Sequence, residues 1–285
     1  MLIQQVIQGL AIGSVYGVIA LAFVLIYNAM GVLNFAQGEV FMAGAFAGLF
    51  FHVVLGLPFI VAFPLAIIAG SLLGWLIERI AFRPLFNAPE VNILIATIGM
   101  SIFLRNLFRV FFGADPYPFP TVFGDKPVYV GGVLLIPQNL WIAGIGLLLV
   151  VLIRLLLTQT FIGRALRAAA QDRDTASLMG INPKSTVSLT WTLASGLGAA
   201  AGVLVAPLFF VMADMGTLMG LKGFSAAVFG GIESVTGAMA GGLLLGLAES
   251  LGGGFISSGY QSAIAFGLLI LVLIFKPSGI MGRKL

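Results

Sequence analysis

The chain has 285 residues, of which 60% are hydrophobic and 8% are charged, and its mean hydropathy is +1.14. Soluble domains carry about 25% charged residues, so this composition excludes a soluble enzyme, a nucleic-acid-binding protein and a secreted module. The 14 basic and 10 acidic residues give a net charge of +4, which says little about partners beyond lipid headgroups. With no cysteine and only one histidine, His52, we expect no disulfide and no metal site.

Long apolar runs recur along the whole chain. A bilayer core of about 30 Å requires about 20 apolar residues in a helix, and continuous runs do not suit the alternating strands of a barrel. We therefore predict an all-α transmembrane bundle of about eight spans, organised as a single domain over residues 1–285. The predicted spans are Val6–Tyr27, Val40–Leu57, Pro58–Ile77, Val91–Phe112, Leu140–Leu157, Val187–Met212, the region Phe224–Gly254, and Ala263–Phe275.

Lysine and arginine are concentrated in a few connections, and the cytosolic loops of membrane proteins carry an excess of these residues. The richest basic stretch, Arg154–Lys184, is therefore predicted to be cytosolic, as is the connection that contains Arg79 and Arg83. The connection Gly113–Pro137 is then external, and its aromatic residues are typical of a membrane interface.

The C-terminal tail is also basic, and it is therefore also predicted to be cytosolic. A single crossing by Phe224–Gly254 would place the tail outside, so we predict that this region enters and leaves on the same side as a broken or re-entrant helix pair. Such non-helical backbone is tolerated at membrane depth only where protein or a water-filled cavity covers it. The basic tail residues are Lys276, Arg283 and Lys284, and the expected break points are Gly230, Gly231 and Gly237.

A second predicted break lies between the first two spans, where polar residues and glycines interrupt the apolar sequence. Two broken segments in the two halves of a chain are typical of a substrate path. A charge at a helix centre costs about 2.5–3.5 kcal/mol on insertion scales, so it is expected to face a cavity or a partner. The residues predicted to line the path are Asn34, Gln37, Gly38 and Glu39, which follow Gly31, together with Gly230, Gly231 and Glu233.

Other ionisable residues have plainer interpretations. Glu233 fits an interfacial position as well as it fits the path, and Glu249 is expected near an interface or in an ion pair. Arg105 and Arg109 share one helix face, and we expect both to extend toward lipid headgroups. His52 is expected at an interface and is given no role.

Glycines recur at four-residue spacing, which makes flat helix faces that can approach one another closely. We expect these faces to pack inside one bundle, although some of them would also suit a partner subunit. The spaced glycines are Gly9, Gly13 and Gly17, and the pairs Gly44 and Gly48, Gly70 and Gly74, Gly198 and Gly202, Gly237 and Gly241, and Gly242 and Gly246.

The predicted cytosolic stretch contains a segment too polar to cross the membrane. Strong helix formers from Ala165 to Met179 predict a helix of about four turns, which Gly180 would end and Pro183 would keep from continuing. A soluble partner could bind such a projecting helix. The dipeptide Gly-Lys of a phosphate-binding loop does not occur, so we expect no ATP hydrolysis by this chain.

The segment Arg167–Ala170 with Met179–Asn182 resembles the coupling motif of ABC-importer permeases. Further motifs follow one another along nearly the whole chain, namely Asn34–Glu39, Glu78–Arg79 with Arg83–Leu85, Ala96–Gly99, Ala226–Ile232 and Pro277–Ile280. Together these motifs make the chain similar to the LivH-type permeases of bacterial ABC importers for branched-chain amino acids. Glu233 departs from the family pattern, in which a small residue follows Gly-Gly-Ile.

The resemblance implies a multi-pass subunit of a bacterial inner-membrane complex. A second, LivM-like permease subunit would complete the pore, two cytosolic ATPase subunits would use the ATP, and a periplasmic protein would deliver the substrate. This chain would bind no cofactor of its own. Contact with the ATPase is expected at Arg164, Arg167, Ala169, Ala170, Arg173 and Gly180, with the alanines in close contact and the arginines contributing little.

Other functions stay open at this point. Permeases for urea and short amides look very similar to the LivH type. A stand-alone channel or ion-coupled carrier would need no ATPase, and its intramembrane acids would bind protons or cations, but it would not require the cytosolic helix. An intramembrane enzyme has the least support, because the chain lacks cysteine and has no G-x-S-x-G or H-E-x-x-H motif.

Overall fold

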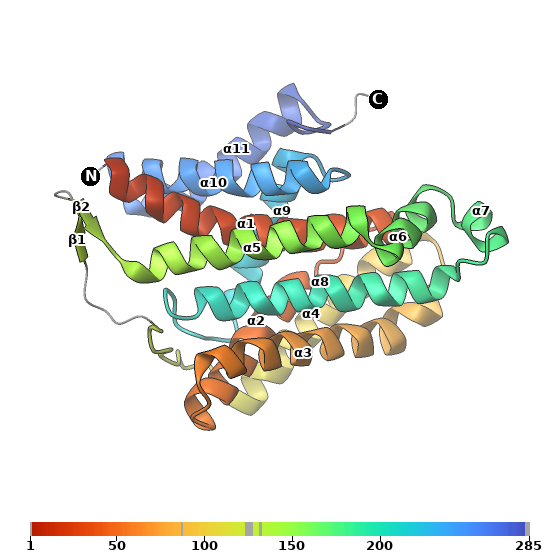
Figure 1. Cartoon of the computed structure of the whole chain (residues 1–285), viewed down its shortest axis with the longest axis horizontal. Helices are drawn as coiled ribbons and strands as arrows, with labels where there is room; N and C mark the ends of the chain where they lie inside the picture. The colour runs from red at the N-terminus through yellow and green to blue at the C-terminus, as the bar shows by residue number, and fades with distance from the viewer. Residues whose placement is uncertain (1, 87, 123–127, 131–132, 283–285) are drawn as a thin grey trace.

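Helices make up most of the regular structure in the computed structural model, which describes residues 2–86, 88–122, 128–130 and 133–282 (Figure 1). Eight helical stretches of the described chain are long and apolar enough to cross a membrane, which confirms the predicted all-α bundle. The helices are α1 (Leu2–Met30), α2 (Gln37–Leu49), α3 (Phe59–Ile77), α4 (Glu90–Phe112), α5 (Pro137–Gln159), α6 (Phe161–Gln171), α7 (Arg173–Leu178), α8 (Pro183–Val205), α9 (Met215–Gly230), α10 (Val235–Phe255) and α11 (Gln261–Phe275).

Shorter elements extend these helices or connect them. A π-helical turn, Phe50–Val54, lengthens α2, and the turns Glu78–Phe82 and Arg83–Leu85 lengthen α3. Strands β1 (Val128–Val130) and β2 (Val133–Leu135) form an antiparallel hairpin before α5. The predicted spans before α8 match the observed helices within a few residues at each end.

The core of the bundle is built around α1, whose residues 13–26 are all buried. A helix that is apolar on every side belongs in an interior, and α1 packs against α5, α8, α9 and α10. In contrast, α3, α4, α5 and α11 leave large apolar side chains exposed. Such faces suit lipid or a partner subunit.

Glycine faces bring the central helices close together. An added Cβ on Gly13 of α1 would lie 2.9 Å from the Cα of Leu243 on α10. On the other side of the bundle, Gly44 of α2 and Gly70 of α3 both face Ala199 of α8. The expected packing of the spaced glycines inside one bundle is confirmed.

The bundle has two distinct ends. At the α6–α7 end, Arg173 contacts Ala29 at the end of α1, and the backbone of Ile280 bonds to Phe229. At the hairpin end lie the start of α1, the β-hairpin and the connection between α10 and α11 (Figure 1). The basic stretch and Lys276 therefore lie at one end, as predicted, while Arg283 and Lys284 lie outside the described residues.

The sixth predicted span, Val187–Met212, extends too far. Helix α8 ends at Val205, and residues 206–214 form turns and a β-bridge between Val211 and Tyr117. Pro207 has no backbone N–H and therefore cannot donate the next helical hydrogen bond, so the helix gives way to turns after Val205. The segment leads from the hairpin end back into the bundle, where α9 begins.

The seventh region turns back as predicted, but its break points differ. Helices α9 and α10 form a pair joined by residues 231–234 at the α6–α7 end, so the chain returns to the hairpin end. Gly230 and Gly231 lie at that turn, and Gly237 is inside α10, so none of them breaks a helix at mid-depth. The break within the bundle is instead the segment 206–214.

Candidate functional site

The predicted break between the first two spans is present as residues 31–36, which lead from α1 to the buried start of α2. Gly31 adopts a φ of +74°, which favours glycine, and its N–H closes the last turn of α1 on Tyr27. Asn34 accepts a hydrogen bond from the backbone of Ala36 at 3.0 Å. Gln37 donates to the Ala194 carbonyl on α8 at 2.9 Å, so these two amides anchor the loop.

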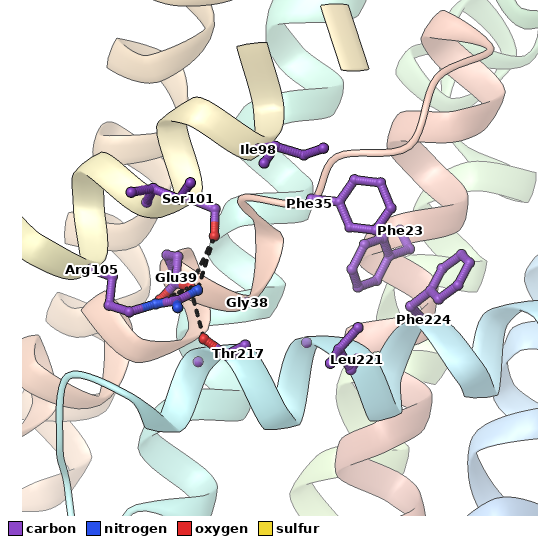
Figure 2. Close-up of a pocket in the computed structure, with 13 residues that line it drawn as sticks. Phe23, Phe35, Gly38, Glu39, Ile98, Ser101, Arg105, Thr217, Leu221 and Phe224 are labelled. Carbon is purple, nitrogen blue, oxygen red and sulfur yellow. Dashed lines mark hydrogen bonds and ion pairs between the residues drawn. The ribbon is translucent and has the colours of Figure 1, made fainter. Parts of the chain in front are cut away.

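Glu39, in the first turn of α2, is the centre of a polar cluster in the apolar bundle. Its Oε1 atom accepts hydrogen bonds from Arg105 Nη2 at 2.8 Å, from Ser101 Oγ at 3.0 Å and from Thr217 Oγ1 at 3.3 Å. These partners come from α4 and α9, so three helices meet at one carboxylate (Figure 2). Burying a carboxylate requires this kind of charged and hydrogen-bonding environment.

The second oxygen of Glu39 is different, because it has no hydrogen-bond partner among the described residues. The side chain is 1% exposed, while its partner Arg105 is 25% exposed. Buried oxygens without a partner are uncommon and often mark a functional role or a missing ligand. The backbone of α9 lies close by, since an added Cβ on Gly216 would be 2.7 Å from this oxygen.

A cavity of about 190 Å³ opens beside the Glu39 cluster. One wall is polar and carries Glu39, Ser101, Arg105 and Thr217, and the facing wall is apolar (Figure 2). The remaining lining residues are Phe23, Phe35, Gly38, Ile98, Ile102, Gly216, Gly220, Leu221 and Phe224. The cavity therefore offers an anion, a guanidinium and aromatic surface to one small molecule.

The expectation for Arg105 and Arg109 is wrong, because neither extends freely toward headgroups. Arg105 turns inward to Glu39, and Arg109 forms an ion pair with Asp214, just before α9, at 2.5 and 2.7 Å. Ser101 and Arg105 lie four residues apart on α4 and therefore share a face. The four-residue spacing of Ser101 and Arg105 in the sequence indicates that this face of α4 is polar inside the membrane.

Glu249 lies in a second buried cluster. The sequence predicted this residue near an interface or in an ion pair, and the structure shows an ion pair. Lys222 of α9 forms an ion pair with its Oε1, and Tyr16 of α1 donates to its Oε2 at 2.8 Å. Lys222 was missed, although a single lysine within an apolar run is costly and suggests a buried partner. Neither Lys222 nor Glu249 lines the cavity.

The remaining predicted path residues lie away from Glu39. Gly230, Gly231 and Glu233 are at the α9–α10 turn, where the Glu233 carbonyl accepts a hydrogen bond from Asn28 at 3.2 Å. His52 bonds through Nδ1 to the Leu57 carbonyl at 2.8 Å, at the turn after α2. The structure therefore brings only Gly38 and Glu39 of the predicted path to the cavity.

The predicted cytosolic helix is two helices. Asp172 interrupts it, because its side chain accepts hydrogen bonds from the backbone N–H groups of Asp174 and Thr175 and so begins α7. The Thr175 side chain and backbone, followed by the Asp174 backbone, hold the pKa of Asp172 below its ordinary value. Gly180 has a φ of +83°, as its predicted place after a helix requires.

Side chains of α6 divide into a buried and an exposed set. Ala169 is buried against the bundle, whereas Ala170, Arg164 and Arg167 are exposed and available to a partner. Arg173 differs from the other arginines, because it donates to the Ala29 carbonyl at 2.6 Å. The expected contact of Arg173 with the ATPase therefore does not match this orientation.

Clusters of three or more His, Cys, Asp or Glu side chains suited to a metal ion are absent from the described part of the chain. The side chains that line the Glu39 cavity combine charged, hydroxyl and aromatic groups.

Comparison with known proteins links this architecture to transport. The family described as “Branched-chain amino acid transport system / permease component” matches residues 5–273. The high-affinity branched-chain amino acid transport system permease protein BraD of Pseudomonas aeruginosa is 39% identical, over 99% of this chain and 96% of that protein. LivH of Escherichia coli K12, with the same description, is 36% identical over the same shares.

More distant proteins share the overall architecture. A probable branched-chain amino acid transport permease protein LivH of Methanocaldococcus jannaschii is 28% identical, over 98% of this chain and 92% of that protein. Among solved structures, PsaBC from Streptococcus pneumoniae in complex with Fab has a similar fold, with a TM-score of 0.51 and 14% identity. That likeness covers 95% of this chain and 91% of the other.

Proposed function

The chain belongs to the family of branched-chain amino acid transport permease components, and we propose that it is the permease subunit of an ATP-driven importer for leucine, isoleucine and valine. As a family member with eight candidate spans, it is a multi-pass membrane protein. We place it in the bacterial inner membrane with the α6–α7 end in the cytosol, because basic residues gather at that end.

The observation that carries the proposed substrate is the cavity that places Glu39 and Arg105 opposite an aromatic wall. A zwitterionic amino acid would place its ammonium group toward the Glu39 carboxylate and its carboxylate on the partly exposed guanidinium of Arg105. Its apolar side chain would then lie against Phe23, Phe35 and Phe224. A branched aliphatic side chain suits this surface better than a polar one.

The cavity is smaller than the about 300–1,000 Å³ of ordinary small-molecule sites. We infer that a second permease subunit, LivM-like in type, covers its open rim and completes the path. A periplasmic binding protein would deliver the substrate at the hairpin end. The bilayer would surround the exposed apolar faces.

Energy would come from two cytosolic ATPase subunits, one of which binds the exposed side of α6 and α7. Exposed Ala170 and the arginines beside it are the proposed contact, and Gly180 sets the direction in which the chain leaves α7. ATP would be bound by those subunits and not by this chain. Closure of the ATPases must act on this segment differently in the inward and outward states, or it could not shift their equilibrium.

Reconstitution of the complete complex in proteoliposomes tests this function. We expect ATP-dependent uptake of labelled leucine that excess isoleucine and valine inhibit and that urea and acetamide do not. Uptake of urea instead would identify the amide importers as the correct relatives. Leucine movement through this chain alone, driven by an ion gradient, would contradict the ATP-driven mechanism.

The proposed ATPase contact has its own test in a pull-down of the ATPase subunits. Ala170→Trp should abolish binding, because a bulky ring cannot fit a close helix–groove contact, and Gly180→Val should weaken it through backbone strain. Ala263→Trp is the matched control, since Ala263 is exposed near the hairpin end. Normal binding by both Ala170→Trp and Gly180→Val would exclude this segment as the contact.

A further inference from the structure

Arg173, the first residue of α7, points back into the bundle. Its Nη2 atom donates to the Ala29 carbonyl at 2.6 Å, and the guanidinium carbon lies 5.3 Å from the ring centroid of Phe86. The carbonyl belongs to the last turn of α1, where backbone oxygens lack helical partners and favour a cation. An arginine stacked on an aromatic ring is also held in one orientation.

The two segments that Arg173 contacts lead to two different helices that line the cavity, α2 and α4. Ala29 is followed by Gly31 and the loop 31–36, which runs directly into Glu39 on α2. Phe86 precedes α4, which begins at Glu90 and carries Arg105. One guanidinium therefore contacts the chain that leads to Glu39 and the chain that leads to the main ion partner of Glu39.

The end of α1 is a junction for other elements as well. Trp191 of α8 donates to the Met30 sulfur at 3.1 Å, and Asn28 donates to the Glu233 carbonyl in the α9–α10 turn. Because α1 is buried along most of its length, a force applied at this end acts on a rigid, tightly packed helix. The nearest non-helical element is the loop 31–36, which has the positive-φ glycine at its start.

The other arginines of this segment do not share this arrangement. Arg164 lies over the ring of Phe161 in its own helix, 5.9 Å from the centroid, and Arg167 is exposed. These two residues face outward, where a partner would bind. Arg173 is thus the arginine of α6 and α7 that joins this segment to the loop and helix flanking the cavity.

We propose that Arg173 is a positioning residue that transmits the movement of α6 and α7 to the two helices that carry Glu39 and Arg105 in the wall of the cavity. This inference rests on the proposed function, since the movement is supplied by the ATPase subunits. When α7 shifts, its guanidinium moves the end of α1 and Phe86 together. The loop 31–36 and α4 follow, which changes the approach of Arg105 to Glu39 and opens or closes the cavity.

The experiment uses a single thiol, because the chain has no cysteine of its own. Ile98→Cys places that thiol on α4 in the cavity wall, at a position that is 42% exposed. Maleimide labelling of this thiol is measured in the assembled complex, nucleotide-free and trapped with ATP and vanadate. We expect a several-fold change in the labelling rate on trapping, and we expect Arg173→Met to abolish that change.

Three further measurements separate transmission from folding and binding. Arg173→Met should retain the ATPase subunits in a pull-down and continue to hydrolyse ATP while leucine uptake is lost. Phe86→Leu removes the stacking but keeps the hydrogen bond, and it should reduce the labelling change in part. Lys184→Met, which removes an exposed positive charge at the same end, should behave as the unmodified chain.

A full labelling change in Arg173→Met, or normal uptake per ATP hydrolysed, would overturn the inference. Loss of the ATPase subunits from Arg173→Met would also overturn it, since Arg173 would then be a partner contact. If Arg173→Met does not accumulate, an unaltered response in Phe86→Leu decides against it. The labelling assay needs no transported substrate, so an error in the proposed substrate leaves its result interpretable.

Discussion

Glu39 and Glu249 are both buried in the apolar bundle, at 1% and 4% exposure, but their surroundings differ. Both oxygens of Glu249 have a partner, one in the ion pair with Lys222 and one in the hydrogen bond from Tyr16. Glu39 lines a cavity and uses one oxygen for all its bonds, while its other oxygen is buried without a partner next to the backbone of α9. A fully paired buried charge holds helices together, whereas an incompletely paired one is available to a ligand.

The largest effect on stability is expected when the cluster of Glu249, Lys222 and Tyr16 loses its carboxylate. Glu249→Ala leaves Lys222 charged and unpaired in the interior, which should lower the free energy of unfolding by about 3–5 kcal/mol. The amount of folded chain in membranes and its thermal midpoint in detergent measure this loss.

Replacing both charges sharpens the result. Apolar pairs of similar volume often substitute for a buried ion pair without loss of stability, so Lys222→Met with Glu249→Leu should recover the thermal midpoint and leucine uptake. A double variant as unstable as Glu249→Ala would show that the pair does more than neutralise two charges.

A matched pair of hydroxyl deletions compares the two carboxylates directly. Tyr16→Phe removes the 2.8 Å bond to Glu249 and should cost about 1.5–3 kcal/mol of stability, with uptake per folded molecule unchanged. Thr217→Val removes a longer bond to Glu39, of 3.3 Å, and should cost less stability but reduce uptake. The reverse pattern in thermal midpoints and uptake would contradict the assignment of roles.

Enlarging Gly216, whose lack of a side chain lets α9 pack against the backbone of α2 next to Glu39, should inactivate the Glu39 cluster alone. The new Cβ of Gly216→Val would lie 2.9 Å from the Gly38 carbonyl carbon, and overpacking of this kind costs about 1–3 kcal/mol. Uptake should be lost while the Lys222–Glu249 pair is intact. Gly99→Val is the control, because an added Cβ there meets no described atom within 4 Å; uptake by Gly216→Val at the control rate would refute the location of the path.

The smallest effect is expected outside both clusters, at Asp172. Asp172→Ala should raise hydrogen exchange in α7 and leave the thermal midpoint of the bundle unchanged, because only a helix start is lost. Since folding lowers the pKa of this carboxyl, its contribution is complete above the ordinary pKa of 3.8 and disappears as pH falls through the folded value. Equal hydrogen exchange in α7 of Asp172→Ala and of the unmodified protein at neutral pH would contradict this role.

Much of the fold was predictable because the bilayer imposes the length and apolarity of each span. The predicted end of the third span, Ile77, is the observed one, and the fourth begins one residue from its predicted start. The failure came after Val205, where apolar residues continue but Pro207 prevents a helix. A run of apolar residues indicates burial, but it does not distinguish a helix from an extended segment inside the bundle.

The site was predictable only in part. Glu39 stood out because a carboxylate in an apolar region is costly wherever it lies. Its partner Arg105 is 66 residues away in the chain, and an arginine near a helix end has an ordinary interpretation at the lipid surface. Lys222 and Glu249, 27 residues apart, likewise meet only after α9 and α10 pack together.

The most direct test of the role of Glu39 in substrate binding is the initial rate of leucine uptake per assembled complex in Glu39→Gln. The amide has nearly the same shape and can still accept from Arg105, so the complex should assemble normally. Loss of the negative charge that would bind the substrate ammonium should reduce uptake about tenfold or more, which corresponds to about 1.4 kcal/mol. Uptake at the unmodified rate would contradict the claim that Glu39 binds the transported molecule.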